Sequence, residues 1–252
     1  MRFRWLVGGM ACILLAVVIT GCATTGVSAR NESISHYKMA LGRMQSGDDE
    51  AALYELNIAL QKDNSNRDAH FLAGIIYFKR QSYDQAMDEY KKVTSLDSDF
   101  ADAYNNIGLC YAKKKQYDKA LESFRTAANM PLNSNRINSL LNIGAVYDEM
   151  GNHEKSAESY REVLLAMPSN AVGMFNLATQ YGMLGRYDES IKYFRKLLDI
   201  YPGDAEALLE LGKVYYKQGD NQQASTSLNK VVEVAPDSEF AKSAKEYLDL
   251  MK

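Results

Sequence analysis

RDAHFLAGIIYFKRQSYDQAMDEYKKVTSLDSDF, residues 67–100, is the stretch that decides the fold. It places a small residue, Gly74, inside one apolar segment and another, Ala86, inside the next. The same arrangement returns 34 residues later with Gly108 and Ala120. Self-similarity at a fixed period between about 20 and 50 residues predicts an array of stacked structural repeats.

The repeat extends through most of the chain. The first small residue recurs at intervals of 34, 34, 36, 34 and 34, at Ala40, Gly74, Gly108, Gly144, Ala178 and Gly212. The second follows at Ala52, Ala86, Ala120, Ser156, Ser190 and Ala224. Tyrosines keep the same period at Tyr77, Tyr111, Tyr147, Tyr181 and Tyr215. Small residues let two helix backbones approach closely, so each unit is predicted to be a pair of antiparallel helices that must stack on neighbours to bury its apolar faces.

This pattern resembles the tetratricopeptide repeat over residues 33–238. The resemblance implies an all-α fold, a right-handed superhelical solenoid of six helix pairs. The repeats are expected at 33–66, 67–100, 101–136, 137–170, 171–204 and 205–238. Residues 239–252 place Phe240, Ala244, Tyr247, Leu248 and Met251 on one helical side, which predicts a C-terminal capping helix. The third repeat has 36 residues, with a looser join at 131–136, and the first carries Arg43 where later repeats have tyrosine.

The N-terminus has the layout of a signal segment. Arg2 and Arg4 precede an apolar stretch from Trp5 to Ile19, too short for a stable membrane span. The sequence ITGC at 19–22 resembles the bacterial lipobox, which implies cleavage after residue 21 and lipid attachment at Cys22. The alternative is an ordinary signal peptide or an uncleaved helix. Ala23 after the cysteine favours outer-membrane placement facing the periplasm, and residues 22–32 are expected to be a lipidated cysteine followed by a flexible tether.

A partner is expected to bind the concave face that first helices form in this fold. The sixth position of the repeat holds asparagine in three consecutive repeats, at Asn106, Asn142 and Asn176. An amide side chain both donates and accepts, so such a ladder suits an extended peptide backbone, as a similar ladder does in long arrays of this family. The alternative is that these amides only tighten helix stacking. The fifth and twelfth positions add the remaining predicted groove residues, which are Asn105, Tyr37, Phe71, Phe78, Phe175 and Tyr216.

No pattern in the chain predicts catalysis. There is no phosphate-binding glycine loop and no nucleophile elbow, so we expect a protein that is not an enzyme and that uses no cofactor, metal or small-molecule substrate. His36 and His70 share the fourth repeat position, but no Cys or carboxylate spacing completes a metal site. Cys110 is expected to be a buried apolar residue. The net charge of −3 gives no reason to expect nucleic-acid binding.

Lipobox, tether, repeat number and length together resemble the type IV pilus pilotin lipoproteins. That resemblance implies a protein-binding scaffold, anchored by its lipid, that helps a secretin subunit reach the outer membrane. The carboxylate clamp of chaperone-binding relatives is not matched, because Tyr37 and Leu41 occupy its positions in the first repeat. The alternatives are a general adaptor for peptidoglycan enzymes and a subunit of outer-membrane or exopolysaccharide export machinery.

Overall fold

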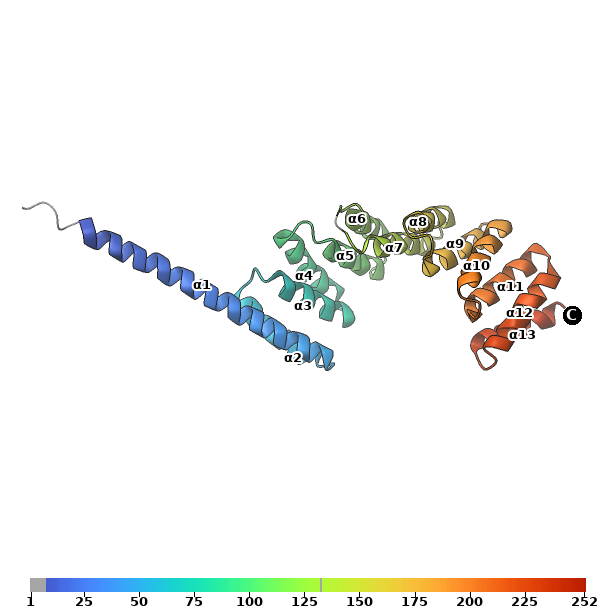
Figure 1. Ribbon diagram of the computed structural model, residues 1–252, viewed down its shortest axis with the longest axis horizontal. Coiled ribbons are helices and arrows are strands. Elements are labelled where there is room, and N and C mark those ends of the chain that lie inside the picture. Colours follow the sequence, from blue (N-terminus) through green and yellow to red (C-terminus); the bar gives the residue numbers. More distant parts are fainter. Residues whose placement is uncertain (1–7, 132) are drawn as a thin grey trace, which may run out of the picture. The chain divides into compact units, whose positions relative to one another are not determined.

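The computed structural model describes residues 8–131 and 133–252, with side chains from residue 26 onward. Every element within these residues is helical (Figure 1). The first five helices belong to one compact unit, Met1–Lys114: α1 (Gly8–Gln45), α2 (Asp49–Lys62), α3 (Arg67–Lys79), α4 (Tyr83–Leu96) and α5 (Ala101–Lys113). The second unit, Lys115–Lys252, contains α6 (Tyr117–Ala128), α7 (Arg136–Glu149), α8 (His153–Ala166), α9 (Ala171–Met183), α10 (Tyr187–Ile200), α11 (Ala205–Gln218), α12 (Asn221–Val234) and α13 (Glu239–Leu250). The predicted all-α fold of stacked helix pairs is confirmed.

The small residues are the points at which paired helices cross. A Cβ atom built on Gly74 would lie 2.5 Å from the ring of Tyr90, and one built on Gly144 would lie 2.6 Å from the ring of Tyr160. On the facing helix, the hydroxyl of Ser156 donates to the carbonyl oxygen of Gly144 over 2.9 Å. The aromatic ring therefore occupies the space that the missing side chain leaves, as the sequence pattern predicted.

Tight turns join the two helices of each pair. Gly47, Gly151, Gly185 and Gly219 have φ between 70° and 89°, the left-handed region in which a glycine avoids the steric cost of a Cβ atom. Gln81 and Lys115 adopt the same region at the equivalent turns. The following helix often begins with a side-chain cap, as where the carboxylate of Asp220 accepts from the backbone N–H of Gln223.

Each unit buries its own core. In the first unit one cluster joins α1, α2 and α3 around Leu56 and Ile76, and a second joins α3, α4 and α5 around Tyr90 and Val93. In the second unit the largest cluster links α9 to α12 around Phe194 and Leu197. Both units thus follow the nearest-neighbour stacking that repeat arrays require.

The N-terminal segment differs from the expected flexible tether. Helix α1 runs through residues 22–32 and continues into the first repeat. The hydroxyl of Ser28 donates to Glu32 one turn later, and Lys62 of α2 forms an ion pair with Glu32, so the exposed part of the segment is held helical by its neighbours. Within the described residues no helix has the length and apolar character needed to cross a membrane.

The C-terminal helix α13 covers the last pair, as the amphipathic pattern indicated. Tyr247, Leu248 and Met251 pack against the core of α11 and α12. The predicted apolar side is shifted slightly, because Ala241 is fully buried whereas Phe240 remains 38% exposed.

Candidate functional site

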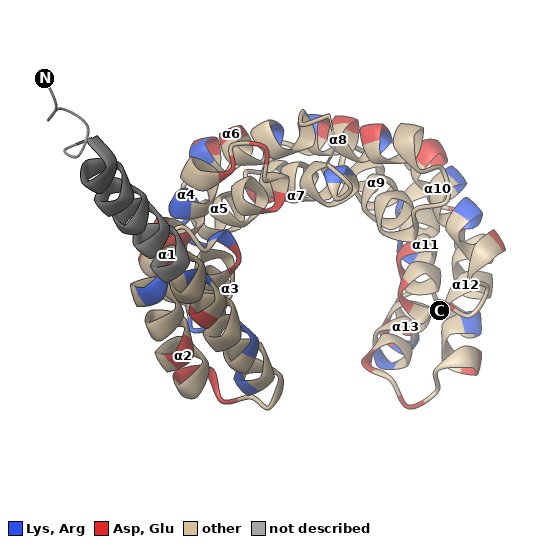
Figure 2. Ribbon diagram, turned by 60° about the vertical axis from the view of Figure 1, so that its left-hand side comes forward, with Lys and Arg blue, Asp and Glu red and all other residues tan. Residues whose placement is uncertain are grey.

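In the second unit the first helices α7, α9 and α11 lie on the inner side of the curve and the second helices lie on the outer side (Figure 2). Asn142, Phe175, Asn176 and Tyr216 belong to these inner helices, and all four side chains are half-buried. Asn142 and Asn176 hold the same repeat position on α7 and α9. The structure therefore carries two of the three predicted amides on neighbouring inner helices of one unit.

The aromatic residues predicted for the groove also pack on the helix cores. Phe175 meets Phe194 of α10 edge-on with ring centroids 5.6 Å apart, and Tyr216 meets Tyr247 of α13 at the same separation. Each ring is therefore fixed by one face while part of it remains accessible. This geometry suits a rigid apolar anchor.

Helix α9 has an apolar inner surface that the sequence analysis did not single out. Its sequence, AVGMFNLATQYGM, contains no charged residue. Val172 is 54% exposed and Met183 is 58% exposed, at opposite ends of the helix. Exposed apolar residues on an uncharged helix favour contact with an apolar segment.

The predicted groove residues of the first unit are likewise partly exposed and packed on neighbouring helices. Phe71 contacts Phe100 at 5.0 Å and Tyr90 at 5.7 Å between centroids, and Phe78 contacts Tyr83 at 5.5 Å. Tyr37 packs on the cluster of α1, α2 and α3, and burial raises the pKa of its hydroxyl. Asn105 and Asn106 are half-buried on α5.

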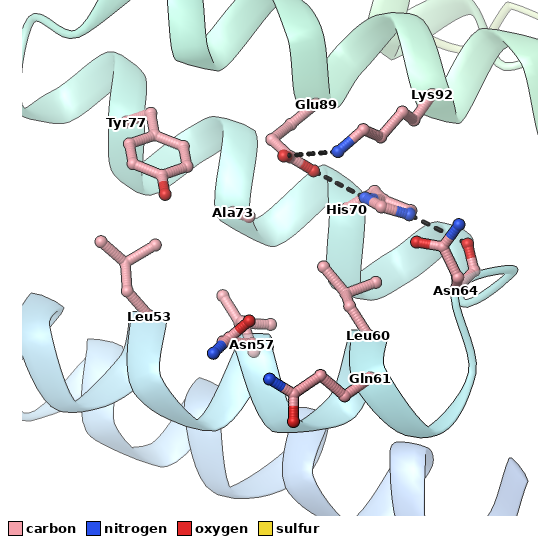
Figure 3. A pocket seen from close by; sticks show the side chains of 11 residues that line it. Leu53, Asn57, Leu60, Gln61, Asn64, His70, Ala73, Tyr77, Glu89 and Lys92 are labelled. Carbon is pink, nitrogen blue, oxygen red and sulfur yellow. Dashed lines mark hydrogen bonds and ion pairs between the residues drawn. The ribbon is translucent and has the colours of Figure 1, made fainter. Parts of the chain in front are cut away.

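Each of the first two histidines pairs with a glutamate from the second helix of its own repeat. Nδ1 of His36 lies 2.6 Å from Glu55, and Nδ1 of His70 lies 2.6 Å from Glu89. Nε2 of His70 lies 3.0 Å from the carbonyl oxygen of Asn64 (Figure 3). Among the described residues no group of His, Cys, Asp and Glu is arranged to hold a metal ion.

His70 lies in an open pocket of about 300 Å³, here named the α2–α4 groove after the second helices that flank it. Lys92 donates to Glu89 over 2.9 Å, so the carboxylate bonds both a lysine and a histidine. Burial raises the pKa of Glu89, but the hydrogen bonds from His70 and Lys92 outweigh it and hold the pKa below the usual value of 4.5. The charges of this groove are thus satisfied within the groove.

A second pocket of about 420 Å³, the α6–α8 groove, lies over α7 in the second unit. Its lining includes the cations Arg125, Arg136 and Lys155, which sequence reasoning missed. Arginine does recur at the position of Arg125 in the next two repeats, as Arg161 and Arg195, and this period could have drawn attention to the outer helices.

The structure describes the side chain of Cys110 but not that of Cys22. Cys22 falls in the part of α1 whose side chains lie outside the described residues, so lipid attachment there stays a prediction. Cys110 is buried as expected, and this burial, together with nearby Asp84, raises the pKa of its thiol to about 12. A thiol with so high a pKa is inert as a nucleophile.

Family models of the tetratricopeptide repeat match residues 74–115, 99–168, 141–205 and 183–246. The type IV pilus assembly protein PilF of Pseudomonas aeruginosa is 34% identical over 93 residues, which are 34% of this chain and 37% of the relative. The aligned part thus spans little more than a third of that relative's length.

Two solved structures have a similar fold over most of the chain. The structure of Pseudomonas aeruginosa PilF gives a TM-score of 0.70 at 22% identity, covering 88% of this chain and 99% of that one. The structure of PilW, described as a widely conserved type IV pilus biogenesis factor, gives 0.70 at 22% identity, covering 84% and 97%. With four family models matched in succession and the helix pairs in place, this chain belongs to the tetratricopeptide repeat proteins.

Proposed function

We propose that this chain is a lipid-anchored scaffold of the outer membrane, facing the periplasm, that assists assembly of an envelope complex such as a type IV pilus secretin. The observation that carries the proposal is the sequence similarity to a type IV pilus assembly protein, together with the lipobox at 19–22. Proteins of this repeat family bind protein partners. The partner proposed here is therefore a protein segment.

The inner helices supply the chemistry for such a segment. Asn142 and Asn176 can each accept from and donate to a peptide unit without selecting its side chain. Val172 and Met183 offer exposed apolar contacts, and Phe175 offers a fixed ring beside them. An extended segment with apolar side chains is the ligand that matches this surface best.

Crosslinking in intact envelopes tests the partner. The lipidated chain is compared with a variant that carries Asn106→Ala, Asn142→Ala and Asn176→Ala, with far-UV circular dichroism as the control for folding. Recovery of a secretin with the parent and its loss with the variant are expected. Recovery of peptidoglycan enzymes or export subunits instead would contradict the secretin assignment and favour the adaptor alternative.

Cys22→Ser tests the anchor separately. The expected result is a larger precursor that is not lipidated, because the thiol is the acceptor of the diacylglyceryl group. A mature species of unchanged size and unchanged membrane association would contradict the anchoring proposal.

A further inference from the structure

The α6–α8 groove of the second unit is lined at repeat positions that correspond to those of the α2–α4 groove. Both have a floor formed by the fourth, seventh and eleventh positions of the repeat, which lie on a first helix. In the α6–α8 groove these are Leu140, Ile143 and Tyr147, with Ala128 beside them. The floor is therefore apolar except for the hydroxyl of the tyrosine.

The cations of this groove have no acidic partner in the described part of the chain. Arg125, Arg136 and Lys155 are exposed, and none forms an ion pair there, whereas Lys92 of the α2–α4 groove is paired with Glu89. Arg136 lies directly before the first position of its repeat, where the other repeats have Asn66, Phe100, Asn170 and Asp204 and no cation. Three positive charges in one pocket create a site for an anion.

Tyr147 adds a directed donor to this site. Arg125 donates a hydrogen bond to the Tyr147 hydroxyl oxygen, which leaves the hydroxyl hydrogen for another acceptor. The Arg125 guanidinium lies 6.0 Å and the Lys155 ammonium 5.5 Å from the centroid of the same ring. Both cations therefore lie close to this ring, and Arg125 also contacts its hydroxyl.

The remaining lining sets the kind of anion. Glu158 and Glu162 border the pocket from α8 and would repel a chain of phosphates, whereas one carboxylate can approach from the side of Arg125 and Arg136. The volume of about 420 Å³ is larger than one carboxylate fills, and the apolar floor can contact an apolar side chain as well. We propose that the α6–α8 groove binds an acidic side chain of a protein segment that also buries a neighbouring apolar side chain.

Fluorescence anisotropy of two labelled peptides tests this inference with the full chain. The probes are Gly-Leu-Leu-Glu-Leu-Leu-Gly and the same peptide with glutamine in place of glutamate. Because hydrogen bonds to charged groups are the stronger ones, the glutamate peptide is expected to bind about tenfold more tightly. Equal affinity for the two peptides would overturn the proposal.

Matched variants locate the site. Arg136→Gln and Lys155→Gln are each expected to weaken binding of the glutamate peptide about tenfold while leaving the glutamine peptide unchanged. Arg161→Gln, which alters the equivalent of Arg125 one repeat later, is the control and is expected to have no effect. If Asn142→Ala with Asn176→Ala abolishes binding and the groove variants do not, the peptide binds the inner helices and the proposal is wrong. This test does not depend on the identity of the partner proposed above.

Discussion

The α2–α4 and α6–α8 grooves have the same arrangement of helices but different charged residues. His70 and Glu89 of the first correspond in repeat position to Leu140 and Ser159 of the second. In the α2–α4 groove the buried histidine, the glutamate and Lys92 form one bonded network. In the α6–α8 groove the equivalent polar network is missing from the described side chains, and Arg125 and Lys155 lie near the ring of Tyr147 instead.

The difference shows which positions the repeat constrains. The first helix of each pair passes close to the second helix, so both repeats have a glycine at the crossing point. Gly74 and Gly144 each face a tyrosine ring of the second helix. Other positions that line the groove differ between repeats, including the buried fourth position, which holds His70 in one repeat and Leu140 in the other. The same arrangement of helices can therefore hold a fully paired polar network in one repeat and a candidate ligand site in another.

The largest expected effect comes from breaking the network of the α2–α4 groove. His70→Leu introduces leucine, the residue that the α6–α8 groove has at this repeat position as Leu140. It leaves Glu89, whose side chain is only 15% exposed, without its buried histidine partner. Loss of one partner of a buried pair costs about 3 kcal/mol of unfolding free energy. Urea unfolding followed by circular dichroism measures it.

A second substitution separates the charge from the packing. His70→Leu with Glu89→Ser reproduces the Leu140 and Ser159 pair, so the loss should shrink to about 1 kcal/mol. A double variant as unstable as the single one would show that the imidazole is needed for its shape.

Overpacking the floor should affect the two grooves alike. Gly74→Ala and Gly144→Ala each drive a Cβ atom into a buried ring, at 2.5 and 2.6 Å, and should destabilise the chain by about 2 kcal/mol despite the better helix propensity of alanine. Gly42→Ala is the control, because nothing lies within 4 Å of its added Cβ, and it should stabilise by up to about 1 kcal/mol. Unequal losses at the two floors, seen as different shifts of the urea midpoint, would contradict the shared frame.

A smaller effect is expected from pH. The pKa of Glu89 lies below 4.5 in the folded chain, so its ionised form stabilises the fold fully above pH 4.5. That contribution is lost as the pH falls through the lowered pKa. Urea midpoints measured from pH 6 down to pH 3 should drop more for the parent than for the double variant at 70 and 89, and parallel curves would argue against the network.

The smallest effect should follow Arg136→Gln. The side chain is exposed and has no ion-pair partner in the described residues, so the unfolding free energy should change by less than about 0.5 kcal/mol. A larger loss in urea unfolding would mean that Arg136 serves the fold of α7 and not a ligand.

The repeat could be recognised in the sequence because close crossing of two helices requires a small residue at each crossing point, as at Gly74, Gly144 and Gly212. The left-handed turns at Gly151 and Gly185 could be predicted for the same kind of reason, since only a few residue types adopt that backbone. Residues 22–32 were expected to form a flexible tether, and the structure describes them as part of α1; their polar composition does not reveal that the helix continues through them or that Lys62 of α2 pairs with Glu32. The residues predicted for the groove lie on first helices, but sequence position alone did not show that Phe71 and Phe175 pack on neighbouring aromatic rings.

The sequence by itself determined the helix pairs, their turns and their order, because these depend on local backbone preference and on a small residue at each crossing. Only the tertiary structure decided which charges meet: Glu89 with His70, nineteen residues away, and Arg125 with Tyr147, twenty-two residues away. Such contacts join side chains of different helices, so they follow from how the helices stack. The residues can recur with the repeat, as His36 with Glu55 and His70 with Glu89 do, but the sequence alone does not show that they touch. The chemistry of the two grooves therefore depends on tertiary packing, whereas the arrangement of helices around them could be predicted from the repeat.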